Sequence, residues 1–174
     1  MSDGWHMLSV VGRDRPGIVA RLTRALYEAG ANLGEATMAR LGGDFAILLM
    51  VQHPGPRQAL EETLAPVARE LGLRLHLDPI EGGLHRHVLP DVRVTVAQAD
   101  RPGIVARVTE ALAAAGLDIV ELESDVAGTE ERPVYVLHLE GRALKGLEPL
   151  ERAVAELARE GLEARLAPVD TVLG

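Results

Sequence analysis

The chain has 174 residues, of which 47% are hydrophobic and 25% charged, a composition typical of one or two globular domains rather than of a disordered segment. Its formal charge of −8 and its few aromatic residues (one Trp, two Tyr and one Phe) argue against a nucleic-acid-binding surface, which normally carries basic side chains and aromatic platforms. The absence of cysteine excludes disulfides, thiolate metal sites and thiol nucleophiles.

Two further features bear on where the protein acts. The beginning of the sequence lacks the basic start and the apolar run of a secretory signal, and no segment has the roughly 18 apolar residues of a membrane span. We therefore expect a cytoplasmic protein that does not associate with a membrane.

The two halves of the chain carry the same motif. The segment Asp14–Arg21 (Asp-Arg-Pro-Gly-Ile-Val-Ala-Arg) recurs without change as Asp100–Arg107, and weaker repetition covers most of the chain. A repeat of this kind indicates two copies of one structural unit. We predict a first domain over residues 5–79, a glycine- and proline-containing linker over 80–91, and a second domain over 92–169.

Each half gives the same elements in chain order. The first is a β-strand, because apolar and polar residues alternate over 6–11 and over 92–97. An amphipathic helix follows over 18–29 and over 104–115, and Gly30 and Gly116 are expected to terminate it.

Two strands joined by a glycine-containing turn come next, at 33–40 and 45–52 in the first half and at 119–126 and 134–140 in the second. A second helix, over 60–71 and over 150–157, and a short strand, at 73–77 and 162–166, complete each half. The predicted fold class is therefore α+β, with two tandem ferredoxin-like βαββαβ modules. Each module would hold an antiparallel four-stranded sheet with two helices on one face.

The repeated Asp-Arg-Pro-Gly motif is the candidate ligand site. Pro16 and Pro102 favour the first turn of a helix, so we expect the unpaired N–H groups of a helix start beside Gly17 and Gly103. A glycine permits close approach of a ligand, and a helix start suits a carboxylate. A structural requirement of the turn would explain the repeated Pro and Gly but poorly explains the repeated Asp and Arg residues, so we interpret the motif as functional.

The turn before the second strand carries a polar residue in both halves, Asn32 in the first and Asp118 in the second. Either side chain could accept a hydrogen bond from an ammonium group and so, together with the loop, complete a site for a free α-amino acid. Either could instead only bind its own turn, as Asn and Asp often do.

These features together resemble the ACT domain family, namely the βαββαβ order, Asp-Arg-Pro-Gly-Ile before the first helix and Asn or Asp before the second strand. The resemblance covers about residues 5–79 and 92–169. It implies that modules pair edge to edge or face to face, form a homodimer and bind a regulatory amino acid at the seam. The residues to which it assigns ligand binding are Asp14, Arg15, Pro16, Gly17, Ile18, Asn32, Asp100, Arg101, Pro102, Gly103, Ile104 and Asp118. Asn is the more familiar residue at the position of Asp118, which leaves open whether both modules bind ligand equally.

No catalytic or metal-binding pattern accompanies the motif. His85 and His87 could share a face as metal ligands do, but they lie in the predicted linker without a supporting Cys or His-Glu motif, so we predict no metal and no cofactor. No Ser lies in a Gly-x-Ser-x-Gly turn, and no Lys-Ser/Thr follows the glycines at 12 and 17, so neither acyl transfer nor nucleotide binding is supported.

We therefore predict an amino-acid-sensing regulatory protein and not an enzyme. It would bind a small amino acid of the glycine or serine class and act on a protein partner, either a transcriptional regulator or a metabolic enzyme, without contacting nucleic acid. Two alternatives stay open, which are a regulatory subunit of an amino-acid biosynthetic enzyme and a purely structural module with empty pockets.

Overall fold

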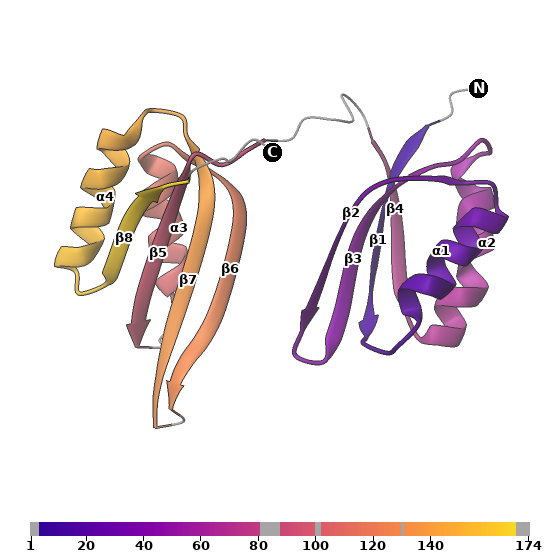
Figure 1. Ribbon diagram of the computed structural model, residues 1–174, viewed down its shortest axis with the longest axis horizontal. Helices are drawn as coiled ribbons and strands as arrows, with labels where there is room; N and C mark the ends of the chain where they lie inside the picture. The colour runs from indigo at the N-terminus through magenta and orange to yellow at the C-terminus, as the bar shows by residue number, and fades with distance from the viewer. Residues whose placement is uncertain (1–3, 81–87, 100–101, 130, 170–174) are drawn as a thin grey trace. The chain divides into compact units, whose positions relative to one another are not determined.

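The computed structural model describes residues 4–80, 88–99, 102–129 and 131–169 (Figure 1). Contacts between backbone segments divide the chain into two compact units, Met1–His85 and Arg86–Gly174. Residues 81–87, which make up most of the predicted linker, lie outside the described part of the chain.

Unit 1 contains one antiparallel sheet and two helices. Its elements in chain order are β1 (Trp5–Arg13), α1 (Ile18–Glu28), β2 (Asn32–Leu41), β3 (Asp44–Gln52), α2 (Arg57–Leu71) and β4 (Arg74–Pro79). The strand order in the sheet is β2-β3-β1-β4, so β2 and β4 are the edges. Both helices lie on the same face of the sheet (Figure 1).

Unit 2 repeats this architecture. Its elements are β5 (Val92–Ala99), α3 (Ile104–Ala114), β6 (Leu117–Thr129), β7 (Arg132–Ala143), α4 (Leu147–Arg159) and β8 (Glu163–Pro168). The strand order is β6-β7-β5-β8, with α3 and α4 on one face (Figure 1). The predicted fold class, two tandem ferredoxin-like modules, is confirmed.

The core of each unit lies between its sheet and its helices. Alternate strand residues face the helices, as Leu8 and Val10 of β1 do, and both are fully buried. Helix residues at a spacing of four, such as Leu22 and Leu26, close the core from the other side. The two units have separate cores, each made almost wholly of aliphatic residues.

The first helix of unit 1 ends as the sequence predicts. Gly30 has a φ of 73°, and its N–H donates to the carbonyl of Tyr27 while the N–H of Ala31 donates to the carbonyl of Leu26. This pair of hydrogen bonds closes the helix in a Schellman motif, which requires the left-handed conformation that glycine adopts at low cost. Gly116, with a φ of 94°, has the same place after α3. No described helix is long and apolar enough to cross a lipid bilayer.

The second hairpin is longer than predicted. Strands β6 and β7 pair from Leu117 with Ala143 to Thr129 with Arg132, whereas the sequence indicated only 119–126 and 134–140. The additional residues at the end of β6, 127–129, are exposed and lack the apolar alternation that marks a strand, whereas Leu117 at its start is buried.

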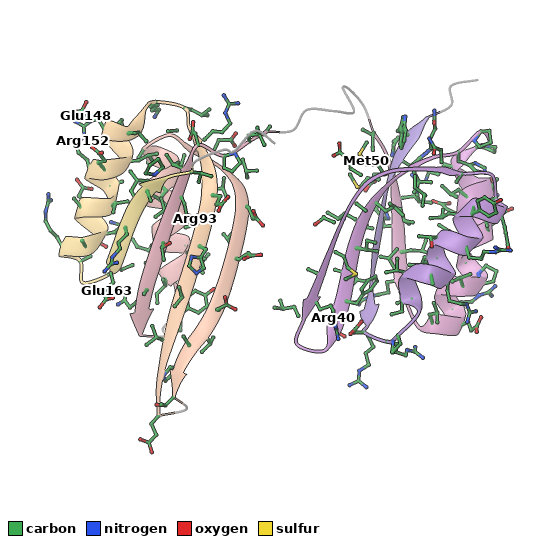
Figure 2. All side chains as sticks on the ribbon, viewed as in Figure 1. Arg40, Met50, Arg93, Glu148, Arg152 and Glu163 are labelled. Atoms are coloured by element: carbon green, nitrogen blue, oxygen red, sulfur yellow. The ribbon has the colours of Figure 1, made fainter. Side chains whose placement is uncertain are left out.

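The sheet faces opposite the helices differ between the units. In unit 1, Met7 of β1 pairs with Met50 of β3. The matching pair in unit 2 is Arg93 with Glu140, which form an ion pair. Figure 2 labels Met50 and Arg93 at these places. The two modules therefore share a core arrangement but present different chemistry on this face.

Candidate functional site

The glycine that precedes the first helix has the same conformation in both units. Helix α1 begins at Ile18 and α3 at Ile104, and the preceding residues Gly17 and Gly103 have φ values of 88° and 89°. This left-handed conformation strongly favours glycine. Pro16 therefore precedes the N-cap and does not lie within the first turn, which corrects the predicted position of the helix start.

Both helix starts are open to a ligand. Neither α1 nor α3 has a side-chain hydrogen bond at its N-cap, and neither has an acidic residue in its first turn. A Cβ placed on Gly17 or Gly103 would meet no atom within 4 Å. The unpaired N–H groups and the positive end of the helix dipole are thus accessible to an anion.

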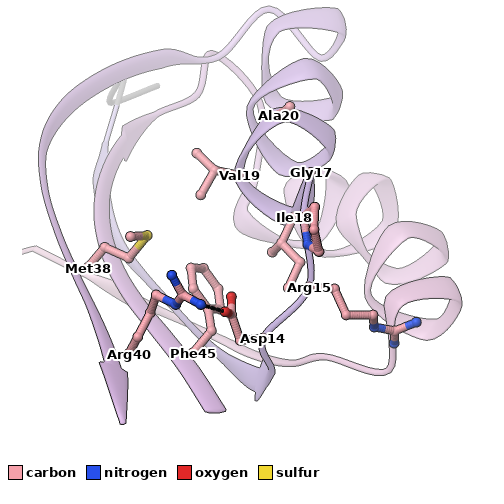
Figure 3. A pocket seen from close by; sticks show the side chains of 10 residues that line it. Asp14, Arg15, Gly17, Ile18, Val19, Ala20, Met38, Arg40 and Phe45 are labelled. Carbon is pink, nitrogen blue, oxygen red and sulfur yellow. Dashed lines mark ion pairs between the residues drawn. The ribbon is translucent and has the colours of Figure 1, made fainter. Parts of the chain in front are cut away.

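Asp14 ties the loop of unit 1 to the β2–β3 hairpin. Its backbone N–H donates to the carbonyl of Gly43 at 3.0 Å, and its carboxylate lies 2.5 Å from the guanidinium of Arg40 at the end of β2. Figure 3 shows this ion pair, with Arg40 reaching across from the strand to the loop. The side chain of Asp14 is 21% exposed and that of Arg40 is 69% exposed.

Arg15 points away from this ion pair. Its guanidinium donates a hydrogen bond to the carbonyl of Leu71, the last residue of α2. Figure 3 shows the side chain extending toward α2 and not toward Met38 or Arg40. Arg15 therefore binds the otherwise unpaired end of a helix, which is a structural role.

The second arginine of the motif also has a structural partner. Arg21 pairs with Glu70 of α2, and its repeat Arg107 pairs with Glu160, which directly follows α4. The hydrogen bond from Arg21 lowers the pKa of Glu70, and that from Arg107 lowers the pKa of Glu160. Arg21 and Arg107 join the two helices of their units, so a structural role accounts for the repetition of this arginine.

A pocket of about 410 Å³ lies beside the loop of unit 1. Figure 3 shows its walls, with Met38 and Arg40 from β2 facing Val19 and Ile18 of α1 across Phe45. The residues that line it are Asp14, Arg15, Pro16, Gly17, Ile18, Val19, Ala20, Met38, Arg40 and Phe45. The first five of these were predicted from the sequence.

Sequence reasoning missed Arg40 and Met38. Neither belongs to the repeated motif, and both come close to the loop only through the pairing of Arg40 with Phe45 and of Met38 with Ile47. The only signal in the sequence was a cation at the end of the predicted second strand, before the turn.

Unit 2 has different residues at these places. Val126 pairs with Tyr135 as Arg40 pairs with Phe45, and Ser124 pairs with Leu137 as Met38 pairs with Ile47. A pocket of about 240 Å³ lies at its helix start, lined by Pro102, Gly103, Ile104, Arg107, Glu160 and Leu162. Its lining comes from the start of α3 and from the residues that follow α4, and not from the hairpin. The predicted site residues Asp100 and Arg101 lie outside the described residues.

The polar turn residues lie at the opposite end of each unit from the loop. Asn32 pairs with Gln52, which also pairs with Trp5 at the start of β1, whereas the loop follows the end of β1. The 11-residue helix α1 separates the two places and is about 16 Å long. Asp118 lies at the start of β6, where it pairs with Arg142 of β7. It is therefore also at the opposite end of its unit from the loop that follows β5. Loop and polar turn therefore do not flank one pocket within a unit, contrary to the expectation that they lie a few ångströms apart.

The described residues contain no cluster of three or more His, Cys, Asp or Glu side chains that could hold a metal ion. The histidines considered as ligands from the sequence, His85 and His87, lie outside these residues.

Comparison with known protein families identifies the first unit. Residues 7–78 match the model of the ACT domain, a range that runs from β1 to β4. Unit 2 has the same strand order and the same left-handed glycine before its first helix, so the chain repeats the ACT-type fold of unit 1.

Three proteins are similar to the chain over most of its length. The glycine cleavage system transcriptional repressor of Escherichia coli (strain K12) is 27% identical over 140 residues, which cover 80% of this chain and 74% of the relative. A crystal structure of an unknown protein from Galdieria sulphuraria superposes with a TM-score of 0.79 and 26% identity, covering 95% of this chain and 98% of that one. A crystal structure of a candidate glycine cleavage system transcriptional repressor has a TM-score of 0.72 and 20% identity, covering 95% of this chain and 97% of that one.

Proposed function

We propose that this protein, with its tandem ACT-type fold, is a non-enzymatic regulator that senses a small amino acid and acts on a protein partner. The observation that carries the proposal is the repeated loop, in which a left-handed glycine leaves the start of the first helix uncapped in both units. The similarity to a transcriptional repressor over 80% of the chain supports a regulatory role.

The ligand of this proposal is an amino acid of the glycine or serine class. Its carboxylate would bind the N–H groups at the start of α1, beside Gly17, where no side chain obstructs it. Its ammonium group needs an acceptor, and Asn32 lies too far away within the same unit to provide one.

Pairing of modules would supply that acceptor. Strand β2 is an edge of its sheet, so it can pair with an edge strand of another module. If two β2 strands paired antiparallel, the start of one, at Asn32, would lie beside the end of the other, at Leu41, next to the loop that contains Gly17. We therefore place the ligand at a seam between modules and expect a homodimer.

The partner of this proposal is a protein in the cytoplasm, a transcriptional regulator of glycine cleavage genes. The name of the Escherichia coli relative motivates this choice. With a charge of −8, direct binding to DNA would be opposed by repulsion from the phosphates, so an effect on transcription would act through another protein. A ligand that changed partner affinity by 5- to 150-fold would need a coupling of roughly 1 to 3 kcal/mol between the two sites.

A thermal-shift screen of the full chain against the twenty common amino acids tests the proposal. A ligand present at about 100 times its Kd adds roughly 2.7 kcal/mol to the free energy of unfolding, which is a readily measured rise in Tm. We expect glycine or serine to raise Tm. If no amino acid changes Tm, the protein is not an amino-acid sensor.

A further inference from the structure

The pocket of unit 1 contains an arginine that the repeated motif does not include. Within the described residues, Arg40 makes one recorded contact, between one guanidinium nitrogen and one oxygen of Asp14. A guanidinium has five N–H donors and a carboxylate accepts through two oxygens, so this contact leaves binding capacity on both groups. The side chain of Arg40 is also mostly exposed, at 69%.

Arg107, which joins the two helices of unit 2, is bound by its carboxylate partner in a different way from Arg40. Two nitrogens of Arg107 donate to the two carboxylate oxygens of Glu160, and the Nε–Oε2 distance is 2.9 Å. A two-point pair of this kind uses the fork of the guanidinium in a structural bond. Arg40, held at one point, remains able to bind a second anion.

The charges at the pocket match those of a free amino acid. Arg40 and Asp14 lie at one side of a cavity of about 410 Å³, with the start of α1 beside them and the apolar side chains of Met38 and Phe45 between the strand and the helix. A ligand carboxylate that enters between the loop and Arg40 meets a cation. The Asp14 oxygen that Arg40 does not contact then offers the ligand ammonium a second acceptor, in addition to Asn32 of a paired module.

Unit 2 lacks this cation. Val126 occupies the place of Arg40 and Ser124 that of Met38. Within the described residues the helix start is open at Gly103, and the hairpin position that Arg40 has in unit 1 carries the apolar Val126.

We propose that Arg40 binds the carboxylate of the ligand and that amino-acid binding is confined to unit 1. The inference rests on the proposed sensing function. It adds that Arg40 selects ligands with a free carboxylate and that unit 1 is the module that binds them. Unit 2 would then act as a module without bound amino acid.

Calorimetric titration of the full chain with glycine and L-serine tests this inference. We expect one ligand per chain, and we expect Arg40→Val, which gives unit 1 the residue of unit 2, to weaken binding by at least about tenfold. Arg40→Lys should restore part of the affinity because it keeps the charge. Arg74→Val is the matched control, since Arg74 is exposed on the other edge strand of the same unit, and it should leave binding unchanged.

A ligand analogue separates carboxylate binding from support of the loop. Glycinamide lacks the negative charge, so it should bind the unmodified protein more weakly than glycine does, and Arg40→Val should not weaken it further. Thermal unfolding of each variant shows that unit 1 is folded.

Three results would overturn the inference. These are two ligands per chain, unchanged glycine and serine affinity in Arg40→Val, or equal affinity for glycine and glycinamide. Each of these leaves the sensing function in place, because an amino acid still binds. Failure of all twenty amino acids to bind would instead overturn the proposed function together with this inference.

Discussion

Arg107 near the start of α3 holds Glu160 at the end of α4 through both carboxylate oxygens, and this bond joins the two helices of unit 2. The hydrogen bond lowers the pKa of Glu160 below its ordinary value. A carboxyl group whose pKa is lowered by folding stabilises the protein above its unfolded pKa, and this stabilisation is lost as the pH falls through the lower folded value.

Glu160→Gln should therefore lower the stability of unit 2 at pH 7 but should have little effect at a pH below the folded pKa of Glu160. Urea unfolding at pH 7 and at the most acidic pH at which the unmodified protein stays folded measures the difference. Glu151→Gln, on an exposed glutamate of the same helix, is the control and should change stability equally little at both pH values. An equal loss at both pH values in Glu160→Gln would show that the ion pair is not the cause.

Arg15→Gln should reduce stability rather than ligand affinity. Arg15 donates to the carbonyl of Leu71 and points away from the ion pair of Asp14, so its loss removes one hydrogen bond at the end of α2. A hydrogen bond of this kind contributes roughly 0.5 to 1.5 kcal/mol, which a shift of the urea midpoint would report. A large loss of amino-acid affinity with unchanged stability would return Arg15 to the ligand site.

Gly17→Ala and Gly103→Ala should each destabilise their unit by about 1 to 2 kcal/mol, the cost of the left-handed conformation for a residue with a Cβ. The loss cannot come from crowding, because a Cβ at either position meets no atom within 4 Å. Gly17→Asn is the comparison, since Asn enters this conformation more easily and should cost less. Equal effects of Ala and Asn, measured by urea unfolding, would contradict the conformational explanation.

Gly141→Ala should destabilise unit 2. A Cβ on Gly141 would collide with the carbonyl of Asp118, next to the register shift between Ile119 and Glu121 at the beginning of β6. The backbone cannot yield as a flexible side chain would, so we expect a loss of roughly 1 to 3 kcal/mol in urea unfolding. The control is Gly161→Ala, where the added Cβ meets open space and only its φ of 92° opposes the change. Unchanged stability in Gly141→Ala would show that the strands do not approach as closely as described.

The order of elements could be predicted from the sequence because it depends on local patterns. The alternation of Leu8 and Val10 and the helical spacing of Leu22 and Leu26 are present in the chain itself, and burial follows them. The far end of β6 could not be predicted, because residues 127–129 are exposed and only their pairing with β7 extends the strand there.

The candidate site was harder to predict because it depends on which residues of neighbouring strands pair with each other. The motif indicated the loop, but Arg40 reaches it only because β2 pairs with β3 up to Leu41 and Asp44. The separation of Asn32 from Gly17, by contrast, follows from the length of α1 and could have been deduced from the predicted helix alone.

Arg21 pairs with Glu70, and Arg107 pairs with Glu160 in the same way. These ion pairs affect how far the function of one protein can be inferred from its sequence similarity to another. In this chain the last residue of the Asp-Arg-Pro-Gly-Ile-Val-Ala-Arg segment ties two helices together, so a match to the segment is not by itself evidence of amino-acid binding. If Arg40 binds the ligand as proposed, ligand binding is better inferred from the residue at the end of the second strand, Arg40 in one module and Val126 in the other. Within this one chain, duplication has kept the scaffold while the two copies diverged at that position.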